Sequence, residues 1–304
     1  MVASDQLYAC PKCRQAPLRQ AEHDGLACPT CGTSFPMVRG VRRFVETEHY
    51  AGSFGYQWNR FAQTQLDSAQ GTTRSRDAFV QKTGWNLDDL RGTRVLDAGC
   101  GMGRYAEVCA QAGAEIHGFD LSNSVDAAVV NLAPHPNARI CQGDIFAPPF
   151  APGSFDYIYS LGVLDHTPDT RRAFLSLVPL LKPGGRIAIW VYWAELAKMF
   201  PGSKWLRKVT PRLPKPLLMQ LCRLAVPLYY VHRVPYVGTI TSKVLPTSMD
   251  VNPEWRMLDT FDWYSPRFHS MHTPEEVHGW FTEAGLTDLA AGPFQVSVSG
   301  RRPA

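Results

Sequence analysis

Short apolar runs alternate with helical segments along the chain from Thr93 onward. The pattern predicts strands at 94–98, 115–119, 139–142, 155–160 and 186–192. Helices are predicted between them, at 104–112, 124–132 and 170–181. Strands that alternate with helices in this way are typical of a doubly wound α/β domain built on a mostly parallel sheet.

The end of the chain predicts one more helix and a hairpin. The helix opens with Thr273-Pro-Glu-Glu, which supplies an N-cap residue, a proline at the first position and a glutamate at the third. Gly285 is a suitable residue to end it. Two short strands, 287–291 and 295–299, flank Gly292-Pro293 and are predicted to pair with each other.

Composition divides the chain into three segments. Residues 1–46 hold two cysteine pairs and are predicted to form a small separate domain. Residues 47–92 are polar and aromatic, include a predicted helix at 73–83, and are interpreted as a linker with helices that cover the ligand site. Residues 93–304 form the large domain, interrupted by a basic and aromatic insertion at 193–272 in which prolines recur.

A glycine-rich loop follows the first predicted strand of the large domain. Gly99, Gly101 and Gly103 are spaced two residues apart and lead into a predicted helix. Glycines let the backbone turn tightly and approach a ligand, while the helix N-terminus offers free N–H groups. The dinucleotide fingerprint needs a glycine where Arg104 stands, and the Gly-Lys-Ser/Thr of nucleotide hydrolases is absent.

This loop, within the sequence VLDAGCGMGRY, resembles motif I of class I S-adenosylmethionine-dependent methyltransferases. The resemblance implies that Asp97 lies near the ammonium group of the cofactor and that the loop glycines let the backbone contact it. The second strand ends in Asp120-Leu121, and an acid there can accept both ribose hydroxyls of an adenosine.

The resemblance continues over the next strand ends and covers about residues 93–192. It places Asp144 beside the adenine amino group and Ile145 against the ring, and it adds Leu161 at the end of the fourth strand to the cofactor site. The implied fold is a doubly wound α/β domain whose seven-stranded, mostly parallel sheet has an antiparallel last strand.

Two groups of residues are candidates for the chemistry of methyl transfer. The reaction is an in-line displacement in which positioning matters most, and a general base helps only an acceptor that must lose a proton. Asp165 and His166 follow the fourth strand and either assist catalysis or shape the loop. Tyr264 and His269 belong to an aromatic and polar stretch that either contacts the acceptor or packs a lid onto the core.

Four cysteines near the N-terminus have the spacing of a metal site. Two Cys-x2-Cys pairs are separated by fourteen residues, which predicts a structural Zn²⁺ bound by Cys10, Cys13, Cys28 and Cys31. The segment resembles the zinc ribbon of the small activator proteins of tRNA and protein methyltransferases. Zinc ribbons are also fused to a family of ribosomal-RNA guanine methyltransferases. The ribbon therefore either has a structural role or docks a substrate.

The positive charge of the chain is concentrated in one segment. Residues 196–249 contain nine Lys or Arg and no Asp or Glu, whereas the rest of the chain has 22 basic against 27 acidic residues. Cations mixed with aromatic and aliphatic side chains suit a membrane surface, a lipid-linked acceptor or a phosphate backbone. The alternative is a solvated face over a hydrophobic lid.

Three features point to a cytoplasmic protein. The N-terminus lacks an apolar stretch of signal-peptide length, and no later apolar stretch has the length of a bilayer span. The remaining cysteines, at positions 100, 109, 141 and 222, are scattered as small core residues are, which fits a reducing compartment.

The sequence as a whole predicts an S-adenosylmethionine-dependent methyltransferase. We expect it to act on a small-molecule or lipid- or saccharide-type biosynthetic acceptor through nitrogen, oxygen or carbon. The enzymatic alternative is methylation of an RNA base, and the non-enzymatic one is a cofactor-binding or activator module. The acceptor, its attacking atom and the oligomeric state are not encoded in a recognisable motif.

Overall fold

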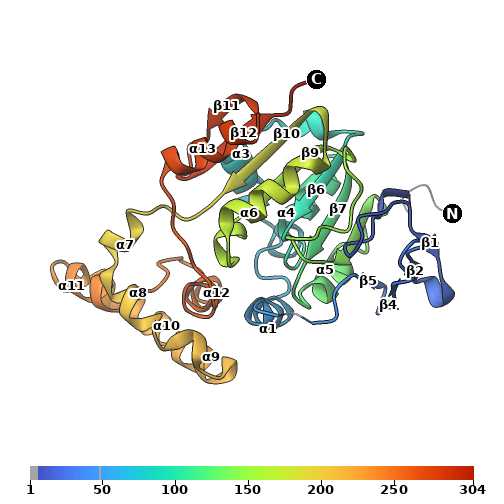
Figure 1. Cartoon of the computed structure of the whole chain (residues 1–304). Coiled ribbons are helices and arrows are strands. Elements are labelled where there is room, and N and C mark those ends of the chain that lie inside the picture. Colours follow the sequence, from blue (N-terminus) through green and yellow to red (C-terminus); the bar gives the residue numbers. More distant parts are fainter. Residues whose placement is uncertain (1–5, 48) are drawn as a thin grey trace.

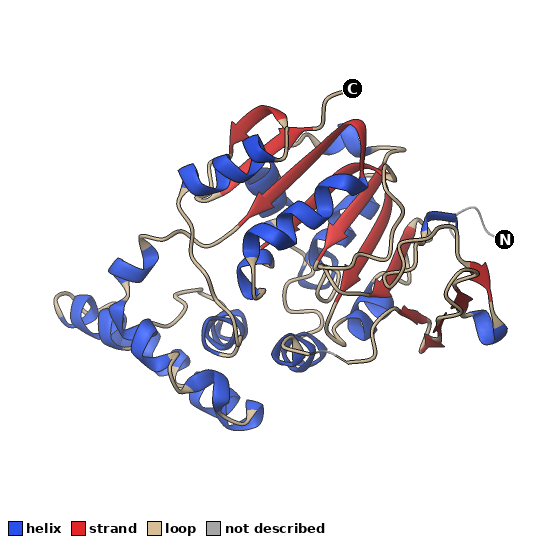
Figure 2. Ribbon diagram, in the orientation of Figure 1, coloured by secondary structure: helices blue, strands red, loops and turns tan. Residues whose placement is uncertain are grey.

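The computed structural model describes residues 6–47 and 49–304, and its core is a nine-stranded sheet (Figures 1 and 2). From one edge to the other the strands are β11 (Thr287–Ala291), β12 (Ser297–Arg301), β10 (Leu181–Trp190), β9 (Phe155–Leu161), β6 (Arg94–Ala98), β7 (Glu115–Asp120), β8 (Ala138–Gln142), β5 (Val41–Arg43) and β4 (Met37–Val38). The strands from β10 to β5 are parallel, whereas β12, β11 and β4 are antiparallel to their neighbours. The predicted α/β class with a mostly parallel sheet is confirmed.

The prediction of seven strands was wrong, because the N-terminal segment adds two. All seven predicted strands are present, and β5 pairs in parallel with the outer edge of β8. Val41 is buried there, and Arg43 donates to Gln142 Oε1 at 3.0 Å and forms an ion pair with Asp126. An uncovered edge of β8 would leave backbone N–H and C=O groups unpaired, and the added strands cover it.

Helices flank the sheet near the predicted positions. They are α3 (Arg74–Thr83), α4 (Arg104–Gln111), α5 (Val125–Asn131), α6 (Thr170–Leu177) and α13 (Pro274–Glu283). Thr273 caps α13 as expected, by accepting from the backbone N–H of Glu276. The helix predicted to reach residue 181 ends at Leu177 instead. A 3-10 turn (Val178–Leu180) containing Pro179 follows it, and β10 starts directly afterwards.

The insertion is a series of short helices rather than a continuous one. They are α7 (Leu196–Met199), α8 (Pro201–Leu206), α9 (Lys215–Cys222), α10 (Ala225–His232), α11 (Val237–Val244) and α12 (Pro253–Tyr264), with a 3-10 turn at Thr210–Arg212. Figure 1 shows α7 to α11 extending away from the sheet, while α12 lies beside α1 (Gly52–Arg60). Among the described residues, no helix combines the length and apolar character that crossing a membrane requires.

The N-terminal segment packs against the main core. Its strands β1 (Arg19–Gln20), β2 (Leu26–Ala27) and β3 (Ser34–Phe35) form a small antiparallel sheet. Tyr8 stacks on Phe150 of the large domain with 5.5 Å between ring centroids, and Arg14 Nη2 donates to the carbonyl of Phe146. The remaining short elements are a helix, α2 (Asp67–Gln70), and 3-10 turns at Glu22–Asp24, Leu87–Leu90 and Leu164–His166.

Candidate active site

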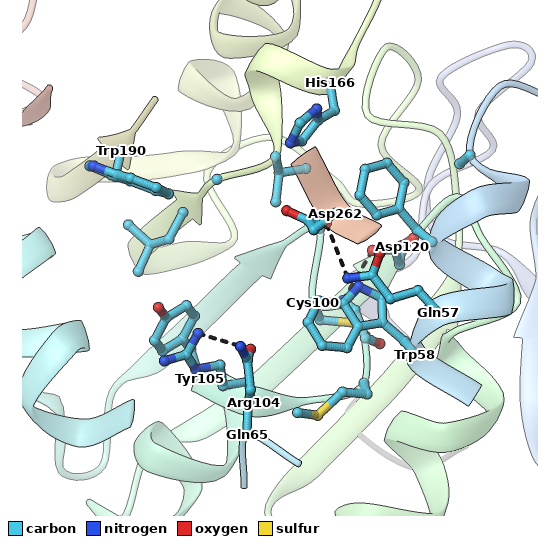
Figure 3. Close-up of a pocket in the computed structure, with 18 of the residues that line it drawn as sticks. Gln57, Trp58, Gln65, Cys100, Arg104, Tyr105, Asp120, His166, Trp190 and Asp262 are labelled. Carbon is cyan, nitrogen blue, oxygen red and sulfur yellow. Dashed lines mark hydrogen bonds between the residues drawn. The ribbon is translucent and has the colours of Figure 1, made fainter. Parts of the chain in front are cut away.

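A cavity of about 460 Å³ opens at the carboxyl ends of the parallel strands. The loops after β6, β8 and β9 and the ends of β7 and β10 form its floor. Residues of α1 and α12 close it from the other side, as Figure 3 shows for Gln57, Trp58 and Asp262. The carboxyl edge of an open α/β sheet is where such folds bind ligands, and this volume is that of a small-molecule site.

The glycine loop has a backbone that a side chain would disrupt. Gly99 has a φ of 91°, and a Cβ at this position would lie 2.3 Å from Cγ1 of Val163. Gly101 has a φ of 53° and lies against Trp58. Both line the cavity, whereas Gly103 stands at the N-cap of α4 with a φ of 92°. The loop therefore exposes backbone to the cavity at the start of a helix.

Asp97 is buried directly before this loop and has an incomplete set of hydrogen bonds. Among the described residues, no donor reaches its Oδ2 atom. Burial raises the pKa of Asp97 to about 8, because a carboxylate loses its hydration there. A cationic group bound near Asp97 would supply the missing partner and favour the ionised carboxylate.

The Asp120 carboxylate is fixed at the cavity wall by backbone N–H groups. Gly101 N donates to Oδ2 at 3.0 Å, and Ser122 N donates to Oδ1 at 2.8 Å. This arrangement links the end of β7 to the glycine loop (Figure 3).

Of the remaining predicted cofactor residues, the apolar ones line the cavity and the acid does not. Leu121, Ile145 and Leu161 belong to the lining. The Asp144 side chain accepts from the backbone N–H of Phe146 at 2.9 Å and shapes the turn, while its neighbour Gly143 faces the cavity.

The opposite wall joins α1, α12 and β10 through hydrogen bonds. Gln57 Nε2 donates to Asp262 Oδ1 at 3.1 Å, and the Tyr192 hydroxyl donates to Asp262 Oδ2 at 3.4 Å. Asp259, one turn earlier on α12, is also in the lining, and burial raises its pKa to about 7. Two carboxyl groups of α12 therefore line the cavity.

The lining also includes cationic residues that sequence analysis missed. Lys82, from α3, lies with Nζ 3.6 Å from the ring centroid of Trp190, and burial lowers its pKa. Arg74 lies over Trp255 with its guanidinium carbon 3.7 Å from the centroid, and Arg104 donates to Gln65 (Figure 3). These residues belong to no recognisable motif. The sequence did predict the helices that carry them, but it did not indicate that these side chains face the cavity.

The structure brings three of the four predicted catalytic residues together. His166 lines the cavity, Asp165 lies behind it without solvent exposure, and His269 stacks on the His166 ring with centroids 5.4 Å apart. Burial raises the pKa of Asp165 and lowers that of His269 to about 2. Tyr264 lies elsewhere, packed between α9 and α12, with its hydroxyl donating to the carbonyl of Pro246 at 2.6 Å.

The four N-terminal cysteines form a cluster. Their sulfur atoms all lie within 4.8 Å of one another, with 3.6 Å between Cys10 and Cys31 and 3.4 Å between Cys13 and Cys28. Cys10 and Cys28 are buried, and Cys31 is exposed. This group has the number and the spacing of ligands that a tetrahedral metal site needs.

Comparison with known proteins identifies the central part of the chain. Residues 96–189 match a family model described as a methyltransferase domain. Phosphoethanolamine N-methyltransferase 2 of Caenorhabditis elegans is 35% identical over 148 residues, which cover 42% of this chain and 34% of the relative. A ubiquinone biosynthesis O-methyltransferase of Thiobacillus denitrificans is 33% identical over 134 residues, covering 40% of this chain and 56% of the relative.

One similar solved structure is that of magnesium protoporphyrin IX methyltransferase from Synechocystis PCC 6803 with bound S-adenosylhomocysteine. The alignment covers 84% of the present chain and 97% of the solved chain. It is 19% identical, with a TM-score of 0.47. The present chain spans about a third of the first curated relative and just over half of the second. Residues 96–189 are therefore similar to methyltransferase domains, and the glycine loop and the order of the parallel strands lie within this matched part of the chain.

Proposed function

We propose that this chain is an enzyme that transfers a methyl group from S-adenosylmethionine to a small-molecule or lipid- or saccharide-type acceptor. The observation that carries the proposal is the cavity at the glycine loop, with Asp120 fixed at its wall and an unpartnered oxygen on Asp97. When bound, S-adenosylmethionine supplies a methyl group activated by a sulfonium.

The residues of the cavity fit the parts of this cofactor. Asp97 offers a buried acceptor for an ammonium group, and Asp120 offers a carboxylate for ribose hydroxyls. Leu121 and Ile145 provide an apolar surface for the adenine ring. Gly99 lets the Val163 side chain of the loop after β9 pack directly against the glycine loop, where a Cβ would clash with it.

The other side of the cavity suits the acceptor. Asp259 and Asp262 face it from α12, and His166 faces it from the loop after β9. The lid formed by α1 and α12 limits access of water, which strengthens electrostatic interactions inside. The names of the two curated relatives, an N- and an O-methyltransferase of small molecules, support a small acceptor attacked through nitrogen or oxygen.

Cofactor binding tests the first step of this proposal. Replacing Asp120 with Ala is expected to weaken binding of S-adenosylmethionine by roughly 1.5–3 kcal/mol, the scale of a lost hydrogen-bonded charged partner. Isothermal titration measures this, with the exposed Asp89→Ala as a matched control that leaves affinity unchanged. Equal affinity of the folded Asp120→Ala variant and the wild type would remove Asp120 from the site. Incubation with a methyl-labelled cofactor and a metabolite extract then identifies the acceptor.

We further propose that residues 196–249, termed here the helical arm, contact an anionic membrane and that the acceptor is lipid-linked. Fifteen of the nineteen exposed large hydrophobic side chains among the described residues lie between Met199 and Val251, and Trp205 and Tyr236 are 69% and 87% exposed. The nine basic residues of the arm are mixed with them. Binding a phosphate backbone requires the charges but not the exposed aliphatic residues, so RNA is the second choice.

Vesicle sedimentation tests the arm. We expect the protein to bind vesicles of phosphatidylcholine mixed with phosphatidylserine more tightly than phosphatidylcholine alone, and less tightly as salt rises. Trp205→Ser is expected to weaken binding roughly tenfold or more, because burial of a large apolar side chain contributes about 1.5–3 kcal/mol. Val130→Ser, at a position equally exposed but outside the arm, is the control. Equal binding to both vesicle types, or an effect of Val130→Ser as large as that of Trp205→Ser, would exclude the arm as a surface for anionic membranes.

We also propose that the four N-terminal cysteines bind a structural Zn²⁺. Sulfur atoms 3.4–3.6 Å apart suit four thiolates about one ion at the usual Zn–S distance of about 2.3 Å. Cys10 and Cys28 belong to the same core cluster as strands of the main sheet, which favours a structural role over docking of a substrate. None of the eight cysteines forms a disulfide bond in the structure, and this supports our proposal of a cytoplasmic location.

Metal analysis tests the cysteine site. Protein purified without added metal is expected to contain about one zinc per chain, and both acid and a chelator should release it, because thiolates bind only when deprotonated. Cys31→Ser should lower the zinc content and the melting temperature, whereas the buried Cys222→Ser leaves the zinc content unchanged. A metal-free protein that melts like the zinc-containing one would refute this assignment.

A further inference from the structure

Three side chains with metal-binding atoms meet at one wall of the cavity. Asp165 and His166 lie in the 3-10 turn after β9, and His269 lies between α12 and α13. One ligand atom of each residue lies within 4.8 Å of the other two. Apart from the four cysteines, this is the one group of this kind among the residues that the structure describes.

The polar atoms of this group lack hydrogen-bond partners. Both carboxylate oxygens of Asp165, the Nε2 atom of His166 and the Nδ1 atom of His269 are buried, and no described residue bonds to them. Each buried polar atom without a partner costs free energy, and such atoms are rare in native proteins. Four such atoms on three neighbouring residues indicate that a ligand accepts their lone pairs.

The orientation of the His166 ring favours a cation as the bound ligand. Its Nδ1 atom lies 3.2 Å from the carbonyl oxygen of Phe268, which can only accept, so Nδ1 carries the proton. The Nε2 atom therefore has a free lone pair, and it lies 3.9 Å from Asp165 Oδ2. Metal-binding histidines typically donate their other ring N–H to a backbone carbonyl or carboxylate in this way.

Backbone hydrogen bonds hold the two loops that carry the group. Ser270 N donates to the carbonyl of Asp165 at 2.9 Å, and His272 N donates to that of Tyr192 at 2.8 Å. The rings of His166 and His269 stack with 19° between their planes. The three side chains are therefore preorganised, although they come from segments about one hundred residues apart.

We propose that Asp165, His166 and His269 bind a first-row divalent cation beside the acceptor side of the cavity. Two imidazoles favour Zn²⁺, Co²⁺ or Fe²⁺ over Mg²⁺ or Ca²⁺, and one carboxylate completes a set that leaves other coordination positions open. His166 also lines the cavity, so a bound ion lies next to the acceptor. If the proposed methyl transfer holds, the ion would bind an acceptor hydroxyl and lower its pKa, so that the hydroxyl proton leaves to water and the ionised oxygen attacks the methyl group.

Titration with CoCl₂ tests this site in the full-length protein with its cysteine-bound metal retained. We expect about one Co²⁺ per chain beyond the metal already present, with visible ligand-field absorption and without the sulfur-to-metal charge transfer of a cysteine site. His166→Gln and His269→Gln should each weaken Co²⁺ binding about a hundredfold or more, because loss of an outer hydrogen-bond partner alone costs 10–100-fold. Asp165→Asn, the third variant of this group, should also weaken Co²⁺ binding.

His278→Gln is the matched control. This histidine lies on α13 outside the group, so Co²⁺ affinity should not change. Unaltered affinity in the His166 and His269 variants, or Co²⁺ uptake only with sulfur charge transfer, would refute the cation site.

Titration of the same variants with S-adenosylmethionine separates this inference from the proposed function. Cofactor binding and methyl transfer that persist without a second metal overturn only the cation site. Loss of cofactor binding in the wild type overturns the proposed function, whatever the Co²⁺ result.

Discussion

S-Adenosylhomocysteine, the demethylated product, is expected to bind about tenfold more weakly for each unit by which the pH falls from 7.5 to 5.5. The pKa of Asp97 is raised to about 8 by burial, so its carboxyl group carries a proton over this range in the free protein. The ammonium group of the ligand binds the carboxylate, and binding must therefore release that proton. Affinity for S-adenosylhomocysteine therefore rises with pH until Asp97 is ionised in the free protein. The slope of log affinity against pH corresponds to one proton released per ligand bound.

Isothermal titration in two buffers with different ionisation enthalpies measures the released proton directly. Asp97→Asn keeps the shape of the side chain but cannot ionise, so it should bind more weakly at pH 7.5 and show no slope. Asp259 is the internal control for other buried carboxyl groups of the cavity: Asp259→Asn should retain the slope, because this residue comes from α12 and accepts from Gln65 and Ser248 rather than adjoining the glycine loop. A pH-independent affinity in the wild type would place the ammonium group away from Asp97.

Local pattern was sufficient to predict the central fold. Strands 94–98 and 155–160 are short, mostly apolar segments, and helical segments separate the predicted parallel strands along the chain. The two extra strands were missed because β5 has three residues and β4 has two. Strands that short have no period of their own, and they form only because β8 presents an open edge.

The candidate site was predictable where residues adjoin strand ends. Gly99, Gly101 and Asp120 follow directly from the order of the parallel strands, whose carboxyl ends meet at one edge of the sheet. Lys82 reaches the cavity through the packing of α3 on α4 and β10, which no local signal encodes. Tyr264 is the opposite case, because the sequence suggested a role in catalysis and the structure places its side chain outside the cavity. The ring packs between helices, and its hydroxyl donates to a backbone carbonyl.

His166→Gln is expected to lower kcat by roughly 10²–10⁴-fold while affinity for the cofactor stays close to that of the wild type. His166 lines the acceptor side of the cavity, and the residues assigned to the cofactor lie in other loops. Glutamine preserves much of the side-chain size but provides neither a basic nitrogen nor an imidazole ligand. Single-turnover rates with the identified acceptor give the change in kcat, and His278→Gln on α13 controls for the loss of a histidine elsewhere.

Asp165→Asn separates the two ways in which this pair can act. Asp165 is fully buried, so it does not touch the acceptor and acts only through His166 or through a bound cation. If it helps to hold a cation, excess Co²⁺ should restore much of the lost rate, because weaker binding is overcome by mass action. If it only orients His166 as a base, added metal changes nothing. A kcat within about threefold of wild type for both Asp165→Asn and His166→Gln would show that the pair shapes the loop, and the search for a base would then move to His269.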